Sequence, residues 1–132
     1  MNSYHLLVVT PDGVAFDGEC ESLLVRTEDG DVEILASHMD YMASLGTGRA
    51  RILAGGVSKF AAVSGGFITV KGGEVKLVSV TFEFKENIDL DRAMTAKEKA
   101  EQKIAAAKDE RTLALAKAKL QRALSRIGVA KM

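Results

Sequence analysis

The first stretch whose residue types and spacing could support chemistry is residues 88–93, with the sequence Ile-Asp-Leu-Asp-Arg-Ala. Two carboxylates and one guanidinium fall within a single helical turn there. Asp89 can accept hydrogen bonds from free backbone N–H groups, and Asp91 places negative charge where the helix dipole favours it. The pattern predicts a helix N-terminus and a candidate ligand site. In the simpler interpretation, Asp89 only caps the helix and Arg92 neutralises it.

Arg122 and Arg126 offer the positive charge that such a site would need to bind an anion. They lie four residues apart on one side of a predicted helix, away from its aliphatic stripe. Two like charges at this spacing repel each other unless an anion or solvent screens them. A triphosphate is one such anion, because guanidinium groups bind phosphate well. A solvated helix face explains the same two arginines, and both interpretations stay open.

No catalytic constellation is visible elsewhere in the sequence. The chain lacks the glycine-rich phosphate loop that ends in Lys-Ser or Lys-Thr. His5 and His38 have no cysteine or carboxylate partners at metal-ligand spacing. His5 is expected to face outward from a strand, and His38 is a candidate contact for a partner. Ser64 precedes Gly65 and Gly66 without an evident base, and a hairpin turn explains this triplet.

Composition narrows the class of protein. With 132 residues, 47% of them apolar, the chain fits one soluble domain with an appendage. Its apolar runs are too short to cross a bilayer, and its start lacks a signal-peptide pattern, which predicts a cytoplasmic protein. Cys20 is the single cysteine and permits no internal disulfide. Because it stands between two glutamates, its thiolate has no basic neighbour, and a passive packing role is expected.

The net charge of zero hides an asymmetry along the chain. Residues 1–84 hold 6 Lys and Arg against 11 Asp and Glu, a net charge of −5, whereas residues 85–132 hold 12 against 7, a net charge of +5. The second part is a basic arm that could fold back on the acidic body or bind an acidic surface elsewhere. Nucleic acid is not expected as a partner, because no aromatic residue follows Phe84 on which a base could stack.

Short apolar and alternating stretches fill residues 1–84 and predict strands. A loop is expected at 36–45, where Met39 and Met42 either tuck under the body or form a docking surface. Strands joined by short turns, without helices between them, predict an antiparallel β-sandwich or a flattened barrel. The predicted strands are 4–10, 14–16, 22–27, 32–35, 49–53, 60–63, 67–71 and 74–80, with a turn at 17–18.

From Asp89 onward the apolar period changes to 3.6 residues, which predicts two helices. Asp109 is the expected N-cap of the second helix, and Gly128 is its expected stop. Both apolar stripes are thin and rich in alanine, so the antiparallel hairpin would depend on docking for most of its stability. The chain is accordingly divided into a β-sandwich domain, residues 1–85, and a helical hairpin, residues 86–132.

Together these stretches resemble the epsilon subunit of bacterial F-type ATP synthases over essentially the whole chain. Residues 30–35 followed by His38 look like the family segment that ends in Pro-Gly-His-Ala-Pro, and residues 65–70 look like its Gly-Gly-Phe-hydrophobic motif. Residues 88–93 match Ile/Leu-Asp-x-x-Arg-Ala, the pattern of ATP-binding epsilon subunits from Bacillus-like organisms. The chain departs from the family at 36–40, Ala-Ser-His-Met-Asp, where both prolines are absent and a charge is added.

The resemblance implies a non-catalytic subunit of the central rotor stalk that couples and regulates rotation, peripheral to the cytoplasmic face of the bacterial cell membrane. It implies that the sandwich binds the gamma subunit and the ring of c subunits. The hairpin would inhibit ATP hydrolysis when extended, by reaching an acidic segment of the beta subunits, and would bind ATP as a regulatory ligand when compact, with no metal required. The implied ATP-binding residues are Ile88, Asp89, Arg92 and Ala93, with Glu83, Arg122 and Arg126 at accessory positions.

Two other classes stay open from the sequence alone. A free-standing ATP sensor would close its helices over nucleotide without any complex, whereas a static adaptor would dock its hairpin permanently on one partner. Co-purification separates the rotor subunit from both of these classes, since only a rotor subunit would purify together with gamma and c subunits. Hydrolysis of bound ATP is not expected, because no base or metal-holding group is placed to activate water.

Overall fold

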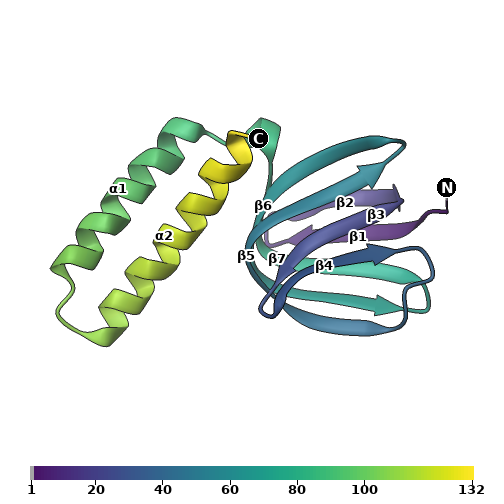
Figure 1. Cartoon of the computed structure of the whole chain (residues 1–132), viewed down its shortest axis with the longest axis horizontal. Coiled ribbons are helices and arrows are strands. Elements are labelled where there is room, and N and C mark those ends of the chain that lie inside the picture. Colours follow the sequence, from purple (N-terminus) through teal and green to yellow (C-terminus); the bar gives the residue numbers. More distant parts are fainter. Residues whose placement is uncertain (1) are drawn as a thin grey trace.

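The chain folds into a β-sheet body followed by two helices that lie side by side at one end of it (Figure 1). The computed structural model describes residues 2–132. The predicted fold class, a β-sandwich followed by a two-helix hairpin, is confirmed. The elements are β1 (Tyr4–Thr10), β2 (Gly13–Cys20), β3 (Ser22–Thr27), β4 (Gly30–Leu35), β5 (Tyr41–Ala54), β6 (Val57–Lys71), β7 (Glu74–Phe84), the 3₁₀ turn η1 (Lys85–Asn87), α1 (Leu90–Ala106) and α2 (Glu110–Ala130).

The seven strands form one continuous sheet in the order β2-β1-β7-β6-β5-β3-β4. The sheet folds over on itself, so that strands from its two ends face each other across the core (Figure 1). The Tyr4 hydroxyl of β1, for example, donates a 2.6 Å hydrogen bond to the carbonyl oxygen of Ile34 in β4. Neighbouring strands are antiparallel, as expected, except that β1 and β7 pair in parallel, with Val9 opposite Val78.

The core of the body follows from period-two alternation along the strands. Leu6 and Val8 of β1 and Leu23 and Val25 of β3 are fully buried, whereas the residues between Leu6 and Val8 and after Val8 are half-buried on the outer face. Each such buried side chain contributes about 1.5–3 kcal/mol of hydrophobic stabilisation. Because the helices bury mainly alanine, the body holds most of this stabilisation.

Strands β2 and β6 run longer than the sequence predicts. β2 continues through residues 17–18, where a turn was expected. β6 is a single strand, and its register with β5 and β7 is the same before and after Gly65 and Gly66. These glycines have φ angles of +71° and +103°, so they distort the strand locally instead of forming the predicted hairpin turn. A Cβ at Gly66 would lie 1.9 Å from the carbonyl oxygen of Val78, so only glycine permits this approach.

The expected loop at 36–45 is shorter than predicted, because β5 begins at Tyr41, opposite Val70 of β6. Met39 and Met42 are 77% and 70% exposed. The interpretation in which these methionines tuck under the body is therefore wrong. Their side chains remain accessible on the surface of the sandwich.

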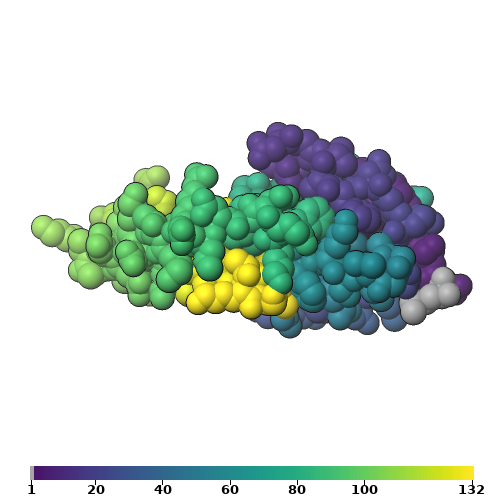
Figure 2. All heavy atoms as spheres, turned by 90° about the horizontal axis from the view of Figure 1, so that it is seen from above, coloured from purple at the N-terminus to yellow at the C-terminus, as the bar shows by residue number. Residues whose placement is uncertain are grey.

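The two helices pack against each other through small residues. Ala93 and Ala100 of α1 and Ala116 and Ala123 of α2 are buried, as the alanine-rich stripes predict. α2 packs on β5 and β6, and α1 packs on the outer side of α2 (Figure 1). Seen from above, the hairpin projects from one end of the sandwich (Figure 2). Within residues 2–132, neither helix combines the length and apolar character needed to cross a membrane.

The predicted N-caps of both helices are confirmed. The Asp89 carboxylate accepts a hydrogen bond from the Arg92 N–H at 3.1 Å, and the Asp109 carboxylate accepts one from the Thr112 N–H at 2.7 Å. The bond from Thr112 holds the pKa of Asp109 below its usual value. The predicted stop at Gly128 is wrong, because this glycine keeps a negative φ and α2 continues for two more residues.

Candidate anion-binding site between the sandwich and the hairpin

A cavity of about 540 Å³ lies where the β1–β2 turn, the end of β7 and both helices meet. Its volume is in the range of small-molecule sites, about 300–1,000 Å³. Because sandwich and hairpin both contribute to its walls, a molecule bound there would contact both parts. The lining residues are Thr10, Asp12, Val80, Thr81, Phe82, Glu83, Asn87, Asp89, Arg92, Ala93, Ala96 and Arg126.

The start of α1 places Asp89 and Arg92 on the wall of this cavity. Asp89 uses its carboxylate to cap the helix, since it accepts from the Arg92 backbone N–H. The expected ion pair between the two side chains is absent, and within residues 2–132 the Arg92 guanidinium makes no side-chain hydrogen bond or ion pair. The capping geometry turns the carboxylate toward the backbone, which leaves the guanidinium available to a ligand.

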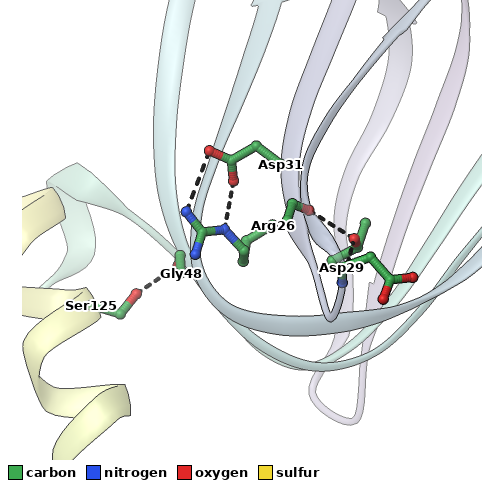
Figure 3. Close-up of polar contacts among 7 residues, drawn as sticks. Arg26, Asp29, Asp31, Gly48 and Ser125 are labelled. Atoms are coloured by element: carbon green, nitrogen blue, oxygen red, sulfur yellow. Dashed lines mark hydrogen bonds and ion pairs between the residues drawn. The ribbon is translucent and has the colours of Figure 1, made fainter.

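Arg126 lines the cavity from α2 and is hydrogen-bonded to the sandwich. Its Nε donates a 2.5 Å hydrogen bond to Oε1 of Glu83 in β7, and the two side chains are 29% and 36% exposed. One residue earlier, the Ser125 hydroxyl donates a 2.6 Å hydrogen bond to the carbonyl oxygen of Gly48 in β5 (Figure 3). These two contacts hold the C-terminal half of α2 against the sheet and so fix the position of Arg126.

Glycine at position 48 is required by the packing on its other side. A Cβ there would lie 2.8 Å from the Cβ of Arg26. Arg26 is itself held by Asp31, whose Oδ1 accepts a 2.7 Å hydrogen bond from its Nε (Figure 3), and this bond lowers the pKa of the Asp31 carboxyl. The β3–β4 hairpin thereby supports the strand that receives Ser125.

Five of the seven residues singled out from the sequence line the cavity. They are Glu83, Asp89, Arg92, Ala93 and Arg126. Arg122 lines a narrow adjoining hollow between α2 and β6, one helical turn from Arg126. Ile88 is half-buried in the connection before α1 and is not part of the lining.

Other lining residues escaped the sequence reasoning, above all Thr10 and Asp12. Thr10 ends β1 and Asp12 lies in the β1–β2 turn, both far from α1 in sequence, and no local pattern relates the two segments. The parallel pairing of β1 with β7 brings them together, with Val9 opposite Val78. The only available signal was the turn itself, since residues 10–13 read Thr-Pro-Asp-Gly next to a predicted strand.

The electrostatics of the cavity are mixed. Three carboxylates, Asp12, Glu83 and Asp89, and two guanidinium groups, Arg92 and Arg126, share its walls. Glu83 pairs with Arg126, and Asp89 accepts from the start of α1. Among residues 2–132, the charged side chains of the cavity that make no hydrogen bond or ion pair are therefore those of Arg92 and Asp12.

His5 lies outside this site, half-exposed on β1 as expected for an outward-facing residue. Its Nε2 lies 2.6 Å from Oδ1 of Asp17, and its Nδ1 lies 2.9 Å from Oε2 of Glu74. The hydrogen bond to Asp17, with that to Glu74, raises the pKa of His5. Within residues 2–132 no group of three His, Cys, Asp or Glu side chains is arranged to hold a metal ion. Cys20 is fully buried, and this burial raises the pKa of its thiol.

The fold and the site define a two-part protein in which a β-sandwich carries a docked helical hairpin, with a charged cavity at the joint. Residues 3–85 match the family model described as "ATP synthase, Delta/Epsilon chain, beta-sandwich domain". Residues 86–131 match "ATP synthase, Delta/Epsilon chain, long alpha-helix domain". The chain belongs to the ATP synthase delta/epsilon chain family.

Relatives named ATP synthase epsilon chain match along nearly the whole length. The Bacillus velezensis protein is 38% identical over 130 residues, 98% of each chain. The Shouchella clausii protein is 38% identical over 131 residues, 99% of this chain and 97% of the relative. A chain in the cryo-EM structure of the Euglena gracilis mitochondrial ATP synthase (OSCP/F1/c-ring) superimposes with a TM-score of 0.84 at 23% identity, covering 98% of this chain and 82% of that chain. The predicted resemblance to epsilon subunits is thus confirmed, and the solved structure supports the fold.

Proposed function

We propose that this chain is a non-catalytic subunit of the central rotor stalk of an F-type ATP synthase, and that ATP binds as a regulatory ligand between its sandwich and its hairpin. The observation that carries the ATP proposal is the cavity whose walls come from both parts. A ligand seated there binds the compact form and not an extended one. It therefore stabilises the compact form by mass action.

The arginines in and beside the cavity suit the phosphates of a nucleotide. Arg92 is without a side-chain partner among residues 2–132, and Arg126 and Arg122 follow on adjacent turns of α2. Guanidinium groups bind phosphate oxygens in bidentate geometry, and the first N–H groups of α1 favour an anion. Glu83 already holds Arg126, so a phosphate must share or displace that bond. Glu83 and Asp89 are both engaged, and Asp12 follows β1, on the other side of β7 from the hollow that Arg122 lines, so we propose that ATP is bound without being hydrolysed.

The outer face of the sheet supports docking of the sandwich to the gamma subunit. Phe67, Val78, Val9 and Val14 are opposite one another on the successive strands β6, β7, β1 and β2, which makes an apolar row across the sheet. Phe67 is 42% and Val14 is 63% exposed. Contiguous exposed apolar residues mark protein interaction sites. We propose that the remaining contact of the sandwich is to the ring of c subunits, peripheral to the cytoplasmic face of the membrane.

The charge of α2 supports the inhibitory role of the hairpin when it extends. Residues 111–132 contain six Lys and Arg and no Asp or Glu. Such a surface would be attracted to an acidic segment of the beta subunits, and salt would screen the attraction. Replacing the basic residues with glutamine should relieve inhibition of ATP hydrolysis in the assembled enzyme while assembly continues. The residues to replace are Lys108, Arg111, Lys117, Lys119, Arg122 and Arg126.

Two experiments test the proposal as a whole. Affinity purification of the native protein should recover gamma and c subunits with it, and a chain that purifies alone would contradict the rotor role. Calorimetry of the isolated chain with ATP should show binding at or below millimolar concentration, with ATP recovered intact. Absence of binding would mean that residues 88–93 serve only to cap α1.

A further inference from the structure

The β1–β2 turn forms part of the sandwich wall of the cavity, beside the end of β7. The backbone N–H of Asp12 donates to Oγ1 of Thr10 at 3.2 Å, and that hydroxyl donates to the carbonyl oxygen of Gly13 at 3.3 Å. Gly13 completes the turn with a φ of +122°. The turn thus uses the backbone of Asp12 and leaves its carboxylate free. Within residues 2–132, that carboxylate makes no hydrogen bond or ion pair.

A second turn of the same chain has the same hydrogen bonding but does not line the cavity. Residues 27–30 read Thr-Glu-Asp-Gly. The Asp29 N–H donates to Thr27 Oγ1 at 3.1 Å, and that hydroxyl donates to the carbonyl oxygen of Gly30 at 2.7 Å. Asp29 lies in the β3–β4 turn (Figure 3) and does not line the cavity. The two aspartates therefore share the hydrogen bonding of their turns, but only Asp12 lines the cavity.

The strand order gives the cavity two unlike ends. Across β7, Thr81 is opposite Ser64 of β6, where Arg122 and Arg126 line the adjoining hollow. On the other side of β7 lies β1, whose last residues lead to Asp12. Because neighbouring strands are about 4.8 Å apart, the backbones of β6 and β1 are separated by about 10 Å across β7. An extended nucleotide has a similar distance between its phosphates and its base, so it could reach from one end of the cavity to the other.

We propose that Asp12 selects the base of the bound nucleotide: its carboxylate accepts a hydrogen bond from the exocyclic amino group of adenine, while the phosphates lie toward Arg122 and Arg126. This inference rests on the proposed function of the same cavity. A carboxylate accepts hydrogen bonds and donates none. It therefore favours a purine with an amino group at position 6 and repels one with a carbonyl oxygen there. Asparagine, which both donates and accepts, makes no such distinction.

The test compares ATP with inosine triphosphate, which carries a carbonyl oxygen in place of the amino group. Calorimetry uses the full chain as wild type, Asp12→Asn and Asp29→Asn, the last being the control with the same turn chemistry. We expect the wild type and Asp29→Asn to prefer ATP by about tenfold. We expect Asp12→Asn to lose that preference while its thermal unfolding stays like that of Asp29→Asn.

The possible failures are distinguishable. If Asp12→Asn keeps the wild-type ratio of the two affinities, Asp12 does not contact the base and this inference is wrong, while the proposed function stands. If wild-type protein binds both nucleotides equally, the same conclusion follows. If the wild type binds neither nucleotide, the proposed ATP site fails and the inference fails with it.

Discussion

Arg92→Ala is the substitution whose effect follows most directly from the structure. The side chain is exposed, lines the cavity and makes no side-chain hydrogen bond or ion pair within residues 2–132. Its removal should therefore leave the stability of the free protein within about 0.5 kcal/mol, as for most surface substitutions. The helix cap is preserved, because the bond to Asp89 comes from the backbone N–H.

The effect on ATP binding should be much larger. A hydrogen bond to a charged group contributes about 1.5–3 kcal/mol, which corresponds to about a 10- to 150-fold change in Kd. No bond within the free protein has to be broken to make this contact, so the loss is not offset. Arg126→Ala should affect stability as well as ATP affinity, unlike Arg92→Ala. It removes a bond from α2 to Glu83 as well as a phosphate contact, so both stability and affinity should fall.

Calorimetry with ATP and denaturant unfolding, on the same preparations, measure the two quantities. Arg111→Ala is the matched control, because it removes the same charge from the hairpin at an exposed position outside the cavity. If Arg92→Ala leaves the Kd within twofold of the wild type, the nucleotide does not bind at this cavity. If Arg111→Ala weakens binding as much as Arg92→Ala, the effect is general electrostatics and not a contact.

Three further predictions concern the body. A chain limited to residues 1–85 should stay soluble and unfold cooperatively, since the large buried side chains lie there; aggregation or a gradual transition would contradict this. Gly66→Ala should lower the free energy of unfolding, measured with denaturant, by at least about 3 kcal/mol, because its Cβ would lie 1.9 Å from a carbonyl oxygen of β7. Gly73→Ala should lower it less, because nothing lies within 4 Å of a Cβ there. Because its carboxylate partners raise the pKa of His5, this group stabilises the fold fully below its unfolded pKa of 6.5, and the contribution is lost as pH rises through the folded pKa. His5→Gln should abolish that part of the pH dependence of unfolding.

The elements that local chemistry determines could be predicted from the sequence. Asp89 and Asp109 cap their helices because an aspartate before a helical repeat offers an acceptor to free N–H groups. The strand interruptions could not be predicted in the same way. Gly65 and Gly66 have the positive φ angles of a turn, yet pairing with β5 and β7 on both sides keeps them within one strand. Long-range strand pairing determines whether these glycines form a hairpin turn or remain within a strand, and this pairing cannot be read from a single sequence.

Some residues of the candidate site could likewise be predicted from local sequence, whereas others depend on long-range contacts. Asp89, Arg92 and Ala93 follow from one helical turn, and Arg126 follows from the charge pattern of α2. Asp12 reaches the cavity only because β1 pairs in parallel with β7, a contact between segments at opposite ends of the sandwich sequence. The pairing of Glu83 with Arg126 also depends on where α2 docks. Neither could be found without the fold.

The contacts between hairpin and sandwich determine how strongly a ligand must bind to control the hairpin. α2 is held to the sheet by the bonds from Ser125 and Arg126 and by small buried side chains such as Ala123. Partly exposed bonds of this kind contribute about 1 kcal/mol each. A ligand that binds only the compact form and is present at 100 times its Kd adds about 2.7 kcal/mol. That amount is similar to what the two bonds supply, so occupancy of the cavity should be able to decide the position of the hairpin.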